Sequence, residues 1–346
     1  MRLLLALLLC LFSLPSPRAE ILLFGDLAGF TRSDPKTATD ADKNDLVPRA
    51  TLFYSGKFGK TRLLAEYTID DQDSHLGRAK LGRELGEDQV LWLGRLHNPT
   101  SYWRSQFHHA AYLQATISRP AISEFESSGG VIPSHLSGLS LEGLSARGEG
   151  GWRYLVAGGF GPTFENSGLE MPKILSGSRG EHDSTLALRL GWLPDSLSGN
   201  EAGLFASRNH LASRIAGINE VEQVFGGVYL NREFGRLSLL SELYYVSNEL
   251  YQSSVSVRDS FTSGYLQAGY QFNRSWQLSG RAEQSWGWRD DAYLAWFPEF
   301  IYQRRVLAVR YELARHHALK LELDRSHHYS GHAYNQAGIQ WTFVFP

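Results

Sequence analysis

The chain has 346 residues, of which 20% are charged, and its formal net charge is −2. Such a balance gives no strong positive field, so no nucleic acid is expected as a partner. The length fits two soluble domains or one large barrel. Beyond the first residues, no run of about 18 apolar residues occurs that would predict a spanning helix.

The first 19 residues are typical of a secretion signal. Arg2 supplies a positive charge, an apolar run follows from Leu3 to Leu14, and Ala19 is a small residue suited to cleavage. The sequence therefore predicts a signal peptide over residues 1–19 and a single domain over residues 20–346. An uncleaved anchor is the alternative interpretation.

From residue 20 onward, apolar side chains recur with a period of two. In residues 317–324, for example, Leu321 and Leu323 alternate with Lys320 and Glu322. Segments of roughly ten residues with one apolar and one polar face are typical of membrane-spanning strands, although the strands of a soluble sandwich also alternate. About sixteen such segments can be counted, with fourteen to eighteen as the limits. They are residues 20–30, 47–57, 60–70, 78–85, 89–97, 137–147, 151–160, 183–193, 201–208, 221–232, 236–247, 260–272, 275–286, 299–312, 316–326 and 334–345.

The connections between these segments alternate between short and long. The short ones carry Gly, Asn and Asp, which favour tight hairpin turns. Aromatic side chains gather near the segment ends, as in the interfacial girdles of membrane proteins. Backbone groups in lipid must be satisfied within the protein, so such strands can span only as a closed barrel. We therefore predict an all-β fold, a transmembrane antiparallel barrel of about sixteen strands with short turns on one side and longer loops on the other.

The longest gap between strand patterns, residues 98–136, is interpreted as a third outer loop that folds into the lumen and narrows it. A compact domain rarely keeps so long an irregular segment unless the segment is functional. A barrel of sixteen strands is too wide for side chains to fill, so it leaves an aqueous channel for the loop to constrict. The candidate constriction residues in this loop are Trp103, Arg104, Arg119, Glu124 and Glu126.

Charged residues at inward strand positions form the second group of pore-lining candidates. A charge at a lipid-facing midplane costs about 2–4 kcal/mol for Arg or Lys, so these side chains are assigned to the lumen. They carry both signs, which fits either a transverse field at the narrowest point or salt bridges that stiffen the wall. The candidates are Arg62, Glu66, Arg95, Glu142, Arg153, Arg189, Arg281 and Arg310, with Lys320, Glu242, Glu283, Glu312 and Glu322 on the same face.

Histidines in or beside the long loop raise the question of a metal. His97, His108 and His135 are the candidates, because two or three imidazoles can bind zinc or copper. Their spacing matches no standard ligand pattern. Neither a metal nor any other cofactor is therefore predicted, and solvated or hydrogen-bonding histidines are the preferred interpretation.

Together, these features resemble those of Gram-negative outer-membrane porins. The resemblance rests on architecture: a signal peptide, about sixteen alternating strands, a longest third outer loop and a final aromatic strand. It implies a channel in the cell outer membrane for passive diffusion of small hydrophilic solutes or ions, and usually a homotrimer. It also implies contact with outer-membrane lipid and with the barrel-assembly machinery.

In that family, acids of the third loop face bases of the wall across an eyelet. The resemblance implies Glu124 and Glu126 as the loop acids, with Arg62, Arg95 and Arg153 as the wall bases. The chain departs from the family at its last residues, because a proline follows the final aromatic residue on which porins usually end.

Two other classes of function stay open. An outer-membrane barrel enzyme would need a Ser, a His and an acid on its rim, but no nucleophile-elbow, paired-carboxylate or phosphate-binding motif stands out, so no enzymatic activity is expected. A closed structural or adhesion barrel would have its loop packed shut and would show no conductance.

Overall fold

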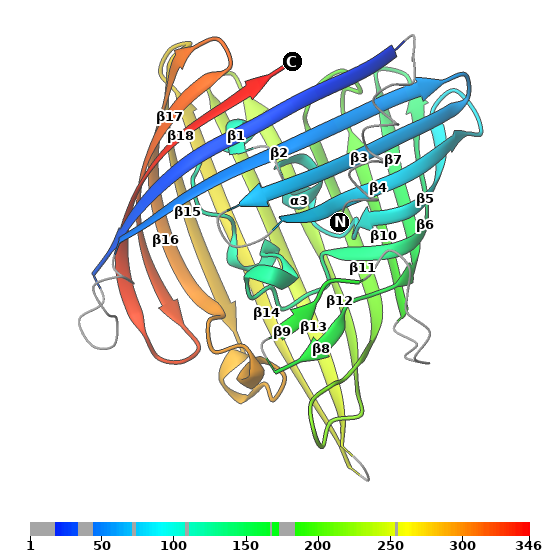
Figure 1. Cartoon of the computed structure of the whole chain (residues 1–346), viewed down its shortest axis with the longest axis vertical. Coiled ribbons are helices and arrows are strands. Elements are labelled where there is room, and N and C mark those ends of the chain that lie inside the picture. Colours follow the sequence, from blue (N-terminus) through cyan, green and yellow to red (C-terminus); the bar gives the residue numbers. More distant parts are fainter. Residues whose placement is uncertain are drawn as a thin grey trace.

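The computed structural model describes residues 18–33, 44–70, 74–107, 111–166, 168–172, 184–252 and 255–346. Sixteen antiparallel strands of these residues form one closed barrel (Figure 1). The predicted all-β barrel and its strand count are confirmed. The barrel strands are β1 (Arg18–Arg32), β2 (Asn44–Phe58), β3 (Thr61–Asp70), β4 (Ser74–Glu84), β5 (Gln89–His97), β6 (His135–Arg147), β7 (Gly150–Phe160), β10 (Ser184–Leu193), β11 (Glu201–Ala212), β12 (Glu220–Phe234), β13 (Leu237–Gln252), β14 (Val255–Gln271), β15 (Trp276–Trp286), β16 (Ile301–Ala314), β17 (His317–His328) and β18 (Ala333–Phe345).

Strands that are neighbours in the chain are also neighbours in the sheet. The exception is β7, which pairs with β10. Between them in the chain, β8 (Thr163–Glu165) and β9 (Gly168–Glu170) form a separate hairpin. The sequence predicts a loop for this stretch. The barrel closes where β1 meets β18, with Leu23 opposite Phe345. Most of the predicted signal peptide, residues 1–17, lies outside the described residues.

Alternation along the strands separates an outer apolar face from an inner polar one. On β17, Leu321 and Leu323 are 53% and 61% exposed on the outside, while Lys320 and Glu322 are buried inside at 0% and 3%. The inward assignment of these charges is therefore confirmed on this strand. Among the described residues, no helix is long and apolar enough to cross a membrane.

Short turns gather at the end of the barrel where β1 begins and β18 ends. Gly59, Gly148 and Gly235 take left-handed φ angles of 61°, 64° and 61° in three of these turns, where a side chain would be strained. Outward aromatic rings pack in pairs near this end, as predicted for an interfacial girdle. The pairs include Trp152–Trp192, Tyr270–Phe272, Trp276–Tyr311 and Trp341–Phe343. At the opposite end β12, β13 and β14 project beyond the other strands, toward the bottom of Figure 1.

The long segment between β5 and β6 is built from short helical pieces. They are α3 (Tyr102–Phe107), η1 (Ala111–Leu113), η2 (Ala121–Ser123) and η3 (Glu126–Ser128). A second irregular segment, between β15 and β16, holds η4 (Trp288–Asp290) and η5 (Leu294–Trp296).

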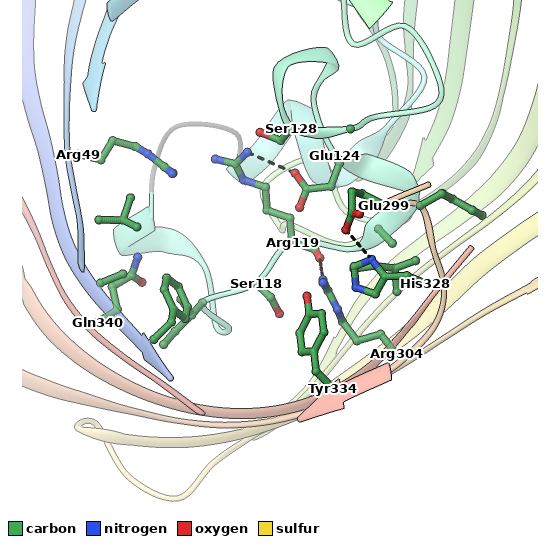
Figure 2. A pocket seen from close by; sticks show the side chains of 18 of the residues that line it. Arg49, Ser118, Arg119, Glu124, Ser128, Glu299, Arg304, His328, Tyr334 and Gln340 are labelled. Carbon is green, nitrogen blue, oxygen red and sulfur yellow. Dashed lines mark hydrogen bonds and ion pairs between the residues drawn. The ribbon is translucent and has the colours of Figure 1, made fainter. Parts of the chain in front are cut away.

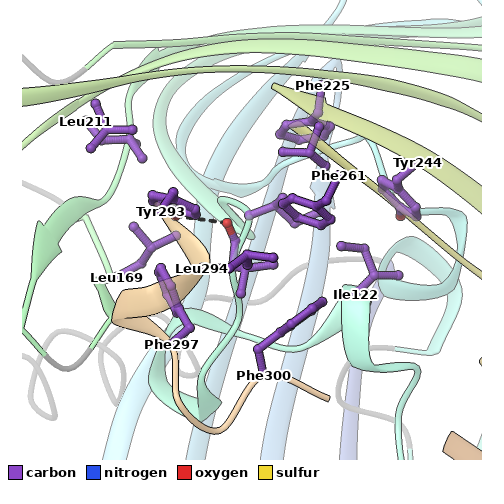
Figure 3. Packing of buried hydrophobic residues seen from close by; sticks show 14 of the residues in the cluster. Ile122, Leu169, Leu211, Phe225, Tyr244, Phe261, Tyr293, Leu294, Phe297 and Phe300 are labelled. Atoms are coloured by element: carbon purple, nitrogen blue, oxygen red, sulfur yellow. Dashed lines mark hydrogen bonds between the residues drawn. The ribbon is translucent and has the colours of Figure 1, made fainter. Parts of the chain in front are cut away.

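The main hydrophobic core lies within the barrel, against the inner faces of β11 to β14. Phe225, Tyr244 and Phe261 project inward from the wall and meet Ile122 of the long segment and Tyr293 of the second segment (Figure 3). The Tyr293 hydroxyl also donates to the carbonyl of Val131 at 2.9 Å. One side of the lumen is therefore filled with apolar side chains.

Candidate channel constriction

Helix α3 is fixed to the wall by a carboxylate. Ser101 precedes the helix, and its hydroxyl oxygen accepts the N–H of Arg104 at 3.1 Å, as an N-cap residue does. Glu242 of β13 accepts the N–H of Trp103 at 2.9 Å and the hydroxyl of Tyr244 at 2.8 Å. The first turn of α3 is therefore bonded to an inward position of the barrel.

Residues 111–121 are bonded to β15 and β17 through their backbone. Glu322 accepts the N–H groups of Ile117 and Ser118 at 2.6 and 3.0 Å. Glu283 accepts the N–H of Ala121 at 2.6 Å. From the same wall, Lys320 donates to the carbonyl of Ala111 at 2.5 Å. These contacts join inward strand positions to the segment, so the segment lies against the inner surface of the barrel.

Two wall arginines complete this attachment. Arg281 donates to the carbonyls of Ser118 and Arg119 at 3.0 and 3.1 Å, and its Nε donates to Glu283 at 2.8 Å. Arg310 donates to the carbonyls of Tyr112 and Gln114. The wall arginines thus form the predicted salt bridges along the wall, Arg281 with Glu283 and Arg310 with Glu312. They also bind the loop backbone, which was not predicted.

A cavity of about 330 Å³, lined by charged and by apolar side chains, remains between residues 117–129 and the inner faces of β1, β2 and β16 to β18 (Figure 2). Three guanidinium groups from different elements reach it: those of Arg49 on β2, Arg119 in the loop and Arg304 on β16. Arg49 and Arg119 point toward each other across the cavity, and Arg304 donates to the carbonyl of Arg119 at 3.0 Å. Burial, aided by the charge of Arg49, lowers the pKa of Arg119 to about 10, so this side chain stays charged at neutral pH.

Three carboxylates line the same cavity. Glu124 lies 3.6 Å from Arg119 in the loop, and Glu299 lies 3.1 Å from His328 Nδ1. Asp26 of β1 sits directly opposite Arg49 in the β1–β2 register. Charges of both signs therefore face one another across this cavity.

Comparisons with known proteins bear on the fold. No family model and no curated protein matches the sequence. Among solved structures, the anion-selective porin of Comamonas acidovorans is 11% identical, with a TM-score of 0.64 over 95% of this chain and 100% of that one. The outer membrane channel DcaP of Acinetobacter baumannii is 12% identical, with a TM-score of 0.59 over 94% and 97% of the two chains. A loop-deletion mutant of OmpT, an outer membrane protein of Vibrio cholerae, is 10% identical, with a TM-score of 0.61 over 95% and 99%.

The chain has the architecture of an outer-membrane porin. At these identities the likeness concerns the fold, and the expected resemblance to porins is confirmed at that level. OmpT and DcaP are outer-membrane proteins, and this chain shares their barrel fold.

Of the predicted loop residues, the porin-like barrel brings Arg119 and Glu124 to the cavity and places the others elsewhere. Trp103 lies in the apolar core, 1% exposed. Arg104 is buried and donates to the carbonyl of Pro133 at 3.0 Å. Glu126 is a buried carboxylate at the end of the loop that faces His135.

Glu126 holds the end of the long segment to the start of β6. Its carboxylate accepts the N–H groups of Ser134 and His135 at 2.6 and 2.8 Å and lies 2.9 Å from His135 Nδ1. Burial raises the pKa of Glu126, but the charge and hydrogen bonds of His135 and the hydrogen bond of Ser134 outweigh it and hold the pKa at about 2. The carboxylate is therefore ionised throughout the ordinary pH range and works as a structural clamp.

The other predicted wall residues are spread around the barrel. Arg62 binds Glu84 at 2.6 Å near the short-turn end, and Glu66 binds Arg78 at 2.5 Å. Glu142 accepts from Trp92 Nε1 at 2.8 Å, and Arg153 binds Glu201; both contacts join barrel strands. Arg95 donates to the sulfur of Met171 at 3.0 Å, and Arg189 donates to Ser105 Oγ at 2.5 Å; both contacts join a strand to a segment between strands. These residues do not converge on the cavity.

The sequence reasoning missed several cavity residues. Arg49, Arg304 and Asp26 occupy inward positions of strands that were predicted, so their alternation was a usable signal. Glu299 stands at the start of the predicted segment 299–312, but β16 begins at Ile301, so Glu299 precedes the strand and the two-residue period does not apply to it.

The histidine candidates do not form a recognisable metal site. The rings of His97 and His135 lie 5.2 Å apart, and His135 faces Glu126, while His108 lies outside the described residues. Within the part of the chain that the structure describes, no three metal-ligating side chains gather closely enough to hold a metal ion.

Proposed function

We propose that this porin-like barrel is an outer-membrane channel for passive diffusion of small hydrophilic solutes or ions. The observation that carries the proposal is the charged cavity between residues 117–129 and the wall. Its guanidinium and carboxylate groups lie in the part of the lumen that the apolar core leaves open. A barrel of sixteen strands has room for an aqueous path beside a packed loop.

The proposal includes a narrowing of that path by the inward segment. The segment is held to the wall by Glu242, Glu283 and Glu322 through its backbone, so the width of the passage is set by fixed contacts. The guanidinium groups of Arg49, Arg119 and Arg304 face the carboxylates across it. A solute that crosses would lose little hydration, because polar groups line both sides of the passage.

Single-channel recording of the refolded protein in a planar bilayer tests this function, with a variant that fills the cavity. Ala28 is an inward residue of β1 that lines the cavity, and Leu27 is its outward neighbour, 40% exposed. We expect discrete open steps that become at least about twofold smaller in Ala28→Trp and stay unchanged in Leu27→Trp. A silent bilayer with a correctly folded barrel would overturn the channel function.

A closed structural or adhesion barrel is the second candidate, because apolar side chains such as Phe225, Tyr293 and Phe297 fill one side of the lumen. The silent outcome of the same recording would support it. We also propose that the barrel has no enzymatic activity, because the sequence carries no nucleophile-elbow or paired-carboxylate motif.

The assembly partners are also proposals. OmpT of Vibrio cholerae has been solved in a trimer form, and this supports the expectation of a homotrimer here. The outward apolar belt fits outer-membrane lipid. Phe345, paired with Leu23 at the barrel closure, is the aromatic residue that we expect the barrel-assembly machinery to recognise.

A further inference from the structure

A row of polar side chains crosses the outer face of the barrel at the long-loop end of β16, β17 and β18 (lower left of Figure 1). Arg305 lies directly opposite Arg325, which in turn lies opposite Asn335. Both arginines are exposed and share the outer face with Leu307 and Leu323, which are 51% and 61% exposed. The row therefore stands at the edge of the apolar belt that faces the long loops.

A surface groove of about 610 Å³ adjoins this row. Leu307, Leu323 and Ala337 each lie two residues from a member of the row, toward the short-turn end of the barrel. They form the apolar floor of the groove. Ala337 is small, so the sheet is hollowed between the larger side chains that flank it. The groove and the two guanidinium groups form one continuous feature, apolar at one end and doubly positive at the other.

The two arginines differ from other outward arginines at the same end of the barrel. On the opposite side, Arg208 binds Glu222 at 2.6 Å across β11 and β12, and Arg258 binds Glu249 across β13 and β14. Among the residues that the structure describes, neither Arg305 nor Arg325 has such an acidic partner. Like charges on facing strand positions destabilise a sheet, so this pair calls for an anion from outside the chain.

We propose that Arg305, Arg325 and the adjoining groove dock a phosphate-bearing membrane lipid, with the phosphate on the guanidinium groups and an acyl chain in the groove. Guanidinium groups bind phosphate oxygens through paired, charge-assisted hydrogen bonds. The position of the row at the edge of the apolar belt puts the phosphate at headgroup level and the chain below it. This site lies on the outer face and is independent of the proposed channel function.

Native mass spectrometry of the folded protein in detergent tests the site. The probe is dioleoyl phosphatidic acid, and dioleoyl phosphatidylcholine, with the same chains and no net negative charge, is the comparison lipid. We expect wild-type protein to retain phosphatidic acid preferentially, and the Arg305→Gln/Arg325→Gln variant to bind it about tenfold more weakly. The matched control is Arg208→Gln/Arg258→Gln, which removes the same charge from the opposite side and keeps wild-type binding.

Further experiments distinguish a bound lipid from free phosphate and from a second copy of the chain. Inorganic phosphate at millimolar concentration should not displace the lipid, because it cannot occupy the groove. Displacement by it would overturn the lipid assignment in favour of a free anion. Equal retention of phosphatidic acid by the two double variants would also overturn the proposal. Loss of oligomers in Arg305→Gln/Arg325→Gln with unchanged lipid binding would assign the face to a second copy of the chain. Heat-modifiable migration on gels confirms that each variant is folded.

Discussion

Two sides of the lumen hold the same inward segment by different means. Along β11 to β14 the wall presents rings such as Phe225 and Phe261, which pack against the segment through apolar surface. Along β15 to β17 it presents Glu283, Glu322 and Arg281, which bind the segment through its backbone. Apolar packing is not directional and scales with buried area, whereas a carboxylate accepts from particular N–H groups. The apolar side therefore mainly fills space, although Glu242 of β13 also fixes helix α3, and the charged side fixes residues 111–121.

The difference explains why the cavity lies where it does. Charged side chains at the wall keep polar atoms at the inner surface, so the space that they leave is polar and accessible to water. Along β11 to β14 the rings instead pack into the apolar core. A sixteen-stranded barrel can thus be packed with apolar side chains on one side and hold charged groups around a cavity on the other.

Removing a ring from the apolar side should have the largest effect. Phe261 is 1% exposed and packs edge-on against Phe300 at 5.8 Å. Phe261→Ala should lower the free energy of unfolding by about 3–5 kcal/mol, because it leaves a cavity among large side chains. Urea unfolding in detergent micelles measures this. Tyr245→Ala, which truncates an outward ring that is 57% exposed, is the control and should cost far less. Equal losses in the two variants would mean that the lumenal core does not stabilise the barrel.

Removing a carboxylate that binds the segment on the charged side should lower the free energy of unfolding less, but it should make the segment more mobile. Glu322→Ala leaves the N–H groups of Ile117 and Ser118 without their acceptor, which costs about 1–3 kcal/mol. We expect faster amide exchange at residues 115–121 and a noisier open channel, with little change in the apolar core. Glu84→Ala breaks ion pairs with Lys57 and Arg62 near the short-turn end and should leave that exchange unchanged. Unchanged exchange in Glu322→Ala would contradict the anchoring role.

Acid should act on the segment through Glu126. Its pKa is about 2 in the folded protein against an ordinary value of 4.5, so its contribution to stability is complete above pH 4.5 and is lost as pH falls toward 2. We expect conductance that is steady from pH 8 to about 5 and a progressive loss of stability below that. Glu126→Gln should be less stable at neutral pH and should lose the part of the acid dependence that this carboxylate supplies. An identical acid dependence in wild type and variant would refute the clamp.

Charge changes in the cavity should alter selectivity with the smallest effect on stability. Arg49→Gln should shift the reversal potential in a salt gradient toward cation preference, and Glu124→Gln should shift it toward anion preference. Stability should change by less than about 0.5 kcal/mol in the former, because Arg49 has no ion pair among the described residues. Arg62→Gln, at the short-turn end, is the control. Shifts of the same sign in the two cavity variants would exclude this cavity as the path of the ions.

Much of the barrel follows from the sequence alone. The two-residue period separates Leu321 and Leu323 from Lys320 and Glu322, and lipid on one side leaves such a strand only one orientation. The strand limits at the short turns followed as well, because Gly residues such as Gly59 and Gly235 mark the turns. At the long-loop end the limits were wrong for strands such as β13, which ends at Gln252, and β14, which begins at Val255, each five residues beyond the predicted segment. Membrane strands are thus well determined by local pattern.

The candidate site was harder to predict. The two-residue alternation tells on which face of the strand a residue lies, but it tells neither its position along the barrel axis nor the residue that it contacts. Arg281 was assigned correctly to the lumen, but nothing in its strand shows that it would bind the carbonyls of Ser118 and Arg119. Arg49 and Arg304 are ordinary inward residues until the loop is placed beside them. The loop has no period at all, so Trp103 could be assigned to the passage when it belongs to the core.

The seam between β1 and β18 also determines the order in which the passage can form. Gln340 on the last strand donates to Asp26 on the first at 2.9 Å, and both line the cavity. Contacts between residues this far apart in sequence form slowly, because a long stretch of chain must be ordered before they can be made. The wall of this cavity is therefore complete only when the final strand has docked on the first, so a partly folded barrel lacks one side of the cavity.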